Sequence, residues 1–169
     1  MSKSRDGECA MGYMTAVKIC LFLLLAGCAP KPAPQAKAAE KLLHAIGREV
    51  QKEFSLQFEG SGGSMPETID ELELLFFANR EGSIEEARKI QLLASEKILQ
   101  KINSDAAIRP YLSEFPFPSS RLSLSISYRR SGSKSIALAF RTRDKIFYYK
   151  AKFQGEGLEM VFSESMRPL

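Results

Sequence analysis

Hydrophobic and polar residues alternate along this chain with two different periods, which predict two helices and several strands. Apolar residues spaced three or four positions apart, as on one face of a helix, occur in two segments. The first stripe comprises Ala39, Leu43, Ile46, Val50 and Phe54, and the second comprises Ala87, Ile90, Ala94, Ile98 and Ile102. Ser83 and Glu86 precede the second stripe with the spacing of a capping box, in which each side chain bonds the other's backbone N–H.

The other segments show the period of two that is typical of strands. The positions expected to face inward are Leu72, Leu74, Phe76, Ala78, Leu122, Leu124, Ile126, Tyr128, Ile136, Leu138, Phe140, Phe147, Tyr149, Ala151, Phe153, Leu158, Met160 and Phe162. Leu75 and Phe77 add a second apolar side to one strand and predict that it is buried on both faces. The glycine-rich segment 60–66 predicts a loop. The fold expected is α+β, with helices packed on an antiparallel sheet of about five strands, in a single domain over residues 39–169.

A different pattern occupies the first part of the chain. Ile19 to Ala26 is an uncharged apolar run preceded by Lys18, too short to span a bilayer but typical of a secretory signal peptide. Leu25, Ala26, Gly27 and Cys28 then form "LAGC", which resembles the lipobox of bacterial lipoproteins. The resemblance implies a signal peptide over 1–27 and acylation of Cys28. Acidic residues near Met1 depart from such leaders, so Met11 or Met14 is an alternative start.

Residues 28–38 are rich in proline and alanine and predict an extended tether between the acylated cysteine and the domain. Of the three cysteines, Cys9 and Cys20 precede Cys28 and belong to the expected leader. The mature chain therefore has no second thiol for a disulfide or a thiolate metal site. We expect a lipid-anchored protein of the cell membrane or outer membrane that faces the periplasm.

Part of the domain resembles a known group of proteins. The segments "GSGGSMP", "EAR", "KINSD" and "RPYLSEFPF", in this order over roughly residues 60–117, are similar to a family of small uncharacterised bacterial proteins. The resemblance implies no activity.

The residue inventory bears on catalytic chemistry. His44 is the single histidine, so histidine-based triads and His/Cys zinc sites lack the residues they need. "SGSK", from Ser131 to Lys134, matches the S-x-x-K pattern of serine acyltransferases, but it falls in a turn and lacks the companion motifs. A carboxylate pair remains open, and we expect no metal, no cofactor and no nucleic-acid partner.

Cations gather in the last part of the chain, where ten Lys and Arg face four Asp and Glu from residue 121 onward. Strand alternation suggests one face that joins small residues to a basic edge, formed by Arg129, Arg141, Arg143, Lys150 and Lys152. This face could bind an anionic partner, such as lipid head groups or an acidic envelope protein. The alternative, which the small residues favour, is that the first helix covers its centre at Ala137 and Ala139 and the cations form a solvated rim.

Three functions are consistent with these patterns. The first is a non-enzymatic envelope lipoprotein with a structural, assembly or binding role. The second is a membrane-tethered hydrolase, which requires polar groups that converge in a cleft. The third is a ligand-binding lipoprotein, which requires an apolar cavity.

Overall fold

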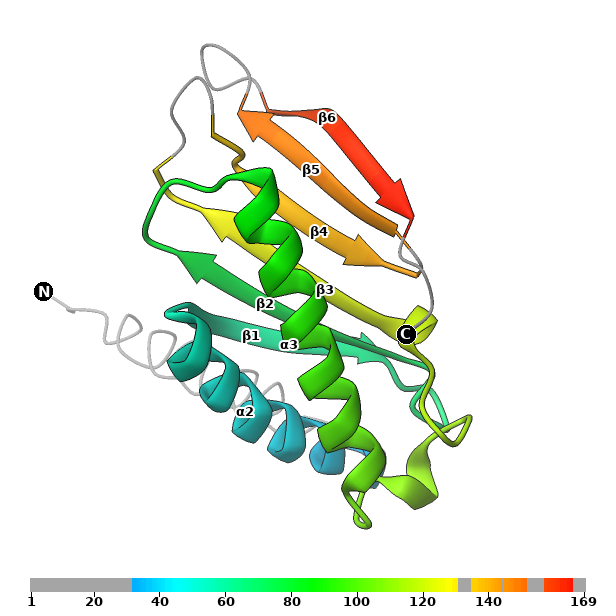
Figure 1. Ribbon diagram of the computed structural model, residues 1–169. Helices are drawn as coiled ribbons and strands as arrows, with labels where there is room; N and C mark the ends of the chain where they lie inside the picture. Colours follow the sequence, from blue (N-terminus) through cyan, green and yellow to red (C-terminus); the bar gives the residue numbers. More distant parts are fainter. Residues whose placement is uncertain (1–31, 131–134, 144, 152–156, 166–169) are drawn as a thin grey trace, which may run out of the picture. The chain divides into compact units, whose positions relative to one another are not determined.

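The computed structural model describes residues 32–130, 135–143, 145–151 and 157–165. Two helices, α2 (Pro34–Phe54) and α3 (Ile84–Ser104), pack on one face of a six-stranded sheet (Figure 1). The strands, in spatial and chain order, are β1 (Gln57–Ser64), β2 (Glu71–Ala78), β3 (Leu122–Tyr128), β4 (Leu138–Thr142), β5 (Lys145–Ala151) and β6 (Leu158–Ser165). Two short 3-10 helices, η1 (Arg109–Tyr111) and η2 (Ser119–Arg121), connect α3 to β3. The predicted α+β class is therefore confirmed, with six strands instead of about five.

The sheet is mixed, so the expectation of an antiparallel sheet is wrong at one pair of strands. β2 and β3 run parallel, with Leu72 opposite Leu122 and Ala78 opposite Tyr128. After β2, the chain returns along the sheet through α3 and enters β3 at the end of the sheet where β2 began. Parallel strands require a crossover connection of this kind. The other four pairs are antiparallel.

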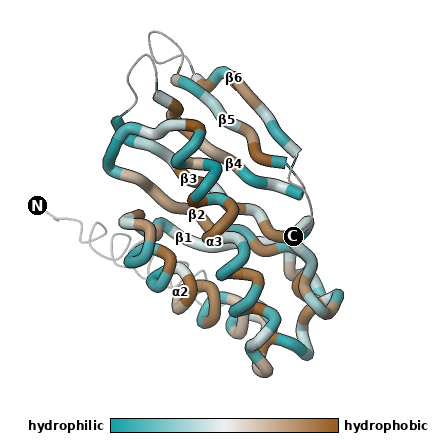
Figure 2. The backbone as a smooth tube through the Cα atoms, viewed as in Figure 1, coloured by the Kyte–Doolittle hydropathy of each residue, from teal (hydrophilic) through white to brown (hydrophobic). Residues whose placement is uncertain are grey.

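Both predicted helical stripes are confirmed and form the core with the sheet. The buried stripe residues are Ala39, Leu43, Ile46 and Val50 on α2, and Ala87, Ile90, Ala94, Ile98 and Ile102 on α3. Most positions between them along each helix are hydrophilic (Figure 2). Ion pairs between Lys101 and Glu49 (3.0 Å), and between Lys97 and Glu53, join the two helices at their surfaces.

Three local expectations need correction. α2 begins at Pro34, so residues 34–38, which we expected in an extended tether, are helical. Proline suits this position because the first helical N–H has no intrahelical acceptor. Gly60 to Ser64 lies in β1 and is not a loop. At the start of α3, the backbone N–H of Glu86 donates to Ser83 Oγ (3.1 Å) as predicted, but the Glu86 carboxylate binds Arg80.

The inward faces of β2 and β3 are as predicted, whereas those of β4 and β5 are reversed. Ala139, Arg141, Ile146 and Tyr148 are buried beneath the helices. Leu138, Phe140, Phe147 and Tyr149, which we expected inside, lie on the other face. Of the inward positions expected on the last strands, Ala151, Leu158, Met160 and Phe162 are exposed, and Phe153 lies outside the described residues.

Candidate binding surface

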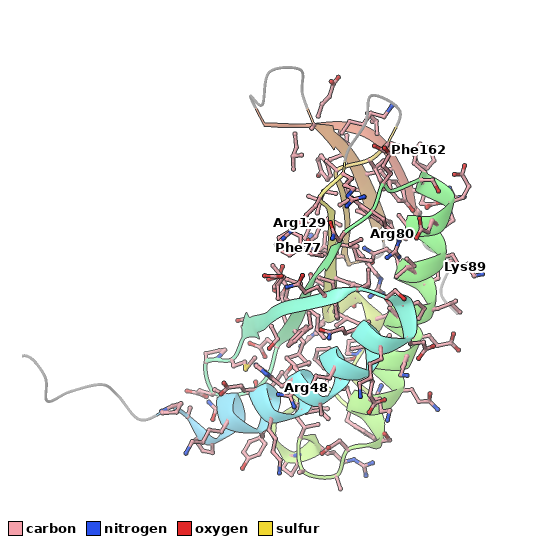
Figure 3. All side chains as sticks on the ribbon, turned by 90° about the vertical axis from the view of Figure 1, so that its left-hand side faces the viewer. Arg48, Phe77, Arg80, Lys89, Arg129 and Phe162 are labelled. Carbon is pink, nitrogen blue, oxygen red and sulfur yellow. The ribbon has the colours of Figure 1, made fainter. Side chains whose placement is uncertain are left out.

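The structure separates the cations that we expected on a single face. Arg129 is exposed on the side of the sheet away from α3, with its guanidinium carbon 4.6 Å from the centre of the Phe77 ring (Figure 3). Arg141 lies on the opposite side and is fully buried. Its guanidinium donates hydrogen bonds to the carbonyl oxygens of Leu122 (3.2 Å) and Ser119 (3.1 Å). Arg141 therefore belongs to the core.

The remaining predicted cations are also dispersed. Arg143 is exposed in the turn between β4 and β5, where its φ of 52° is left-handed. Lys150 is half-buried and lies opposite Glu159 of β6. Lys152 and the "SGSK" turn lie outside the described residues. The prediction of one basic face is therefore wrong, because β4 and β5 present the opposite sides from those that we expected.

Ala139, one of the two small residues expected at the centre of the basic face, is covered by the second helix. Gln91 of α3 is fully buried, and its amide donates hydrogen bonds to the carbonyl oxygens of Leu124 (3.2 Å) and Ala139 (3.0 Å). α3 thus lies over β3 and β4, where we had expected the first helix. Arg141 and Ala139 face this helix together with Leu124 and Ile126, which they oppose across the ladder.

The other side of the sheet has no helix packed on it among the described residues, and we call it the open face (Figures 1 and 3). It is defined by Leu75 and Phe77 on β2, Ser123, Ser125 and Ser127 on β3, Leu138 and Phe140 on β4, Phe147 and Tyr149 on β5, and Met160 on β6. Leu75 is 39% exposed and Met160 is 55% exposed. The prediction that β2 is buried on both sides is therefore wrong at Leu75.

Side chains on the open face differ in size from strand to strand. Three small serines follow one another along β3. Ser125 and Ser127 have larger apolar side chains on β2 and β4 at each side, whereas Ser123 lies opposite Glu73 and donates to the Thr142 hydroxyl (3.4 Å). Since neighbouring strands lie about 4.8 Å apart, the two apolar ridges are about 10 Å apart, the diameter of a helix. Ser125 lies between Leu75 and Phe140, and Ser127 lies between Phe77 and Leu138. A partner can therefore approach the backbone of β3 closely while it buries apolar surface on both ridges.

A surface hollow of about 580 Å³ adjoins the open face at the turn between β4 and β5. Its described lining residues are Thr142, Arg143, Lys145 and Phe147. The hollow combines two cations with an aromatic ring, so it could bind an acidic group of a partner that covers the open face.

A cluster of interacting polar groups joins α3 to the last two strands on the helix-covered side. Arg88 Nε donates to both carboxylate oxygens of Glu164 (2.7 and 2.8 Å), and the Tyr148 hydroxyl donates to the same carboxylate. Burial favours a higher pKa for Glu164, but the bonds from Arg88 and Tyr148 outweigh it and lower the pKa. Burial and the Glu164 carboxylate raise the pKa of Tyr148. The cluster joins α3 to β6, a strand that pairs with β5 and whose other residues are exposed.

Another cavity, of about 430 Å³, lies between the end of α2 and the start of α3. Arg80 lines it and donates to the carbonyl oxygens of Ser55 (2.8 Å) and Phe54 (3.2 Å) and to Glu86 (2.8 Å). The guanidinium therefore satisfies the last carbonyls of α2 and links the two helices. We assign this arginine a structural role.

Metal and membrane features can be stated for the described residues alone. Within residues 32–130, 135–143, 145–151 and 157–165, no group of three or more His, Cys, Asp or Glu is placed to hold a metal ion. No helix in these ranges is both long and apolar enough to cross a bilayer. Cys28 and the segment before it lie outside the described residues.

Comparison with known proteins gives no significant match, whether to family models, to curated proteins or to solved structures.

Proposed function

We propose that this protein is a membrane-anchored envelope lipoprotein with a non-enzymatic binding role, and that the open face is its binding surface. The anchor is the acylated Cys28, and the described domain is the part that meets the partner. The observation that carries the binding role is the sheet face on which none of the described helices packs, with serines between two apolar ridges.

The anchor rests on the order of features in the sequence. A basic residue, an apolar run, small residues and a cysteine follow one another in the order that lipoprotein processing uses. Ala29 after the cysteine resembles the residues that direct lipoproteins to the outer membrane. Two or three acyl chains hold a protein on a bilayer firmly, whereas one chain gives marginal and reversible binding.

The binding role rests on the chemistry of the open face. A sheet with helices on one side commonly exposes polar residues on the other, but here the exposed side carries apolar residues on β2, β4, β5 and β6. Leu75 and Met160 are exposed and the other apolar residues of this face are half-buried, and apolar side chains gathered on one accessible face are typical of an interaction site. After the expected leader the chain has one histidine and one cysteine, and this residue content supports a binding role over histidine- or thiol-based catalysis.

The anchor is tested by Cys28→Ala in the full chain. Cys28→Ala should retain its leader, carry no acyl label and no longer be recovered with the membranes as an acylated protein. Cys20→Ala is the control and should be processed, labelled and recovered like the unchanged protein. Acyl labelling that persists in Cys28→Ala would contradict the proposed anchor.

The binding surface is tested by photo-cross-linking in intact cells. A photoreactive phenylalanine analogue at Ser125, in the centre of the open face, should give a discrete adduct with an envelope protein. The same analogue at Lys89, an exposed position on α3, is the matched control and should give none. Equal adducts at both positions, or none at Ser125, would reject the open face as the binding surface.

A further inference from the structure

One end of the domain is fixed around the start of α2. The Gln35 amide donates a hydrogen bond to the carbonyl oxygen of Pro66 (3.1 Å), in the connection between β1 and β2. Ile69 in this connection pairs with Leu112 in the segment between α3 and β3. The start of α2, this connection and the segment 105–121 therefore lie at the same end, which we call the α2 end (Figures 1 and 3).

The α2 end is the part of the domain that follows Cys28 most closely. Helix α2 begins at Pro34, which leaves five residues between it and Cys28. Six residue steps span about 20 Å at most when fully extended. The 21 residues of α2 are themselves about 30 Å long. An acyl anchor at Cys28 would therefore keep the start of α2 within about 20 Å of the bilayer in every orientation of the domain, whereas the other end of α2 can lie up to about 30 Å further away.

The α2 end presents an exposed aromatic residue with a cation stacked on it. Phe115 is 49% exposed, and the guanidinium carbon of Arg109 lies 4.2 Å from the centre of its ring. The neighbouring residues Ala106, Ala107, Pro110 and Pro116 are also exposed, as is Glu114, whose carboxylate forms an ion pair with Arg121 (3.5 Å). The remaining large apolar side chains that are strongly exposed among the described residues lie elsewhere, at Leu75, Leu93, Leu158, Met160, Val161 and Phe162.

We infer that Phe115 inserts into the interface of the bilayer that holds Cys28, with the Arg109 guanidinium at the level of the lipid phosphates. This inference rests on the proposed lipid anchor. Phenylalanine is among the residues with which surface-bound segments enter the boundary between head groups and acyl chains, and an arginine fork matches the oxygens of a phosphate. One aromatic residue binds a bilayer weakly, but the short tether makes the contact intramolecular and raises its effective concentration.

The contact orients the binding surface. The strands of the sheet end at the α2 end, where Ser64 of β1 lies opposite Glu71 of β2 and Thr142 of β4 lies opposite Lys145 of β5. With this end on the bilayer, the strands stand on the membrane and the open face stays accessible from the side. Phe115 and Arg109 thus select one orientation in which a partner can reach Ser125.

The chain contains no tryptophan, so a single substitution supplies a unique fluorescent reporter. Phe115→Trp tests the contact, and Phe162→Trp on β6 is the matched control, since Phe162 is 42% exposed and lies away from the α2 end (Figure 3). Each variant is made as the full chain in a bacterium that processes lipoproteins, purified in detergent and reconstituted into phosphatidylethanolamine and phosphatidylglycerol vesicles. Two vesicle preparations are compared. In one, the lipids are ordinary, and in the other they carry bromine atoms near the head-group end of the acyl chains, where bromine quenches a nearby tryptophan.

We expect the emission of Trp at position 115 to lie to the blue of the emission of Trp at position 162. The emission at position 115 should be weaker in brominated than in ordinary vesicles, whereas the emission at position 162 should be the same in both. Arg109→Glu added to Phe115→Trp should reduce the quenching. Equal emission of the position-115 reporter in ordinary and brominated vesicles, with the acylated protein floating with the vesicles, would overturn the inference and leave the anchor intact. A chain whose Cys28 carries no acyl group by mass would overturn the anchor itself.

Discussion

Substitution of Arg141 tests whether the structure or the simple alternation of strand residues describes β4 correctly. Alternation predicted an exposed cation, and the structure places the side chain in the core, fully buried. We consider Arg141→Met, which keeps much of the volume and removes the charge and its donors. Arg143→Met is the control, because Arg143 is two residues away and exposed in the turn.

The cost of Arg141→Met can be worked from its contacts. The guanidinium donates to the carbonyl oxygens of Leu122 and Ser119. Each hydrogen bond from a charged donor contributes about 1.5–3 kcal/mol, and a methionine that fills the space recovers part of the loss. We expect a fall of about 3–5 kcal/mol in the free energy of unfolding, a large share of the 5–15 kcal/mol that is usual for a domain. Arg143→Met should cost below about 0.5 kcal/mol.

The assay is equilibrium denaturation in urea of residues 33–169, made without the leader, with the free energy taken by linear extrapolation. Arg141→Lys should fall between the two methionine variants, since it keeps a charge but loses the planar fork. If Arg141→Met matches Arg143→Met to within about 0.5 kcal/mol, the side chain is not in the core and the register of β4 is wrong.

The remaining predictions concern the core and the link between α3 and β6. Ile98→Ala removes a fully buried side chain from α3 and should cost about 2–5 kcal/mol in urea denaturation; a loss below about 0.5 kcal/mol would mean that the helix face is wrong. The lowered pKa of Glu164 implies stability that is present above the pKa of an ordinary glutamate and lost as the pH falls through the lower, folded-state value. Glu164→Gln should therefore flatten the fall in unfolding free energy on acidification, and an unchanged pH profile would count against the Arg88–Glu164 contact.

The helices and the inner strands could be predicted because their apolar residues lie on one side. On α3, Ile90, Ala94 and Ile98 recur at helical spacing and all are buried, whereas Leu93, which falls outside this stripe, is exposed. On β3, serines alternate with Leu124 and Ile126, so the buried side of the strand can be identified from the sequence. When apolar residues occupy only one side of a helix or strand, the pattern determines which side is buried.

β4 and β5 could not be assigned in this way, because both of their sides carry apolar or aromatic residues. On β4 the larger apolar residues, Leu138 and Phe140, lie on the open face, while Ala139 and Arg141 face the helix. Alternation places the larger hydrophobic residues inside, and it had no means to detect that Arg141 finds backbone acceptors in the core. The open face was hidden from sequence reasoning for the same reason.

The parallel pairing of β2 and β3 was missed because periodicity does not report the direction of a strand. The direction follows from α3, whose 21 residues carry the chain back along the sheet between the two strands. A strand, a helix of that length and a further strand form a unit that often pairs in parallel. That signal lay in the order of the elements and not in any single segment.

The central claim is that Cys28 carries the anchor from which the domain meets its partner. The most direct test is the mass of the N-terminal peptide of the protein extracted from membranes of cells that express the full chain. The account predicts a peptide that begins at Cys28 and carries a diacylglyceryl group, with or without a further acyl chain on its amino group. A peptide that begins upstream of Cys28, or one with an unmodified cysteine, would contradict it.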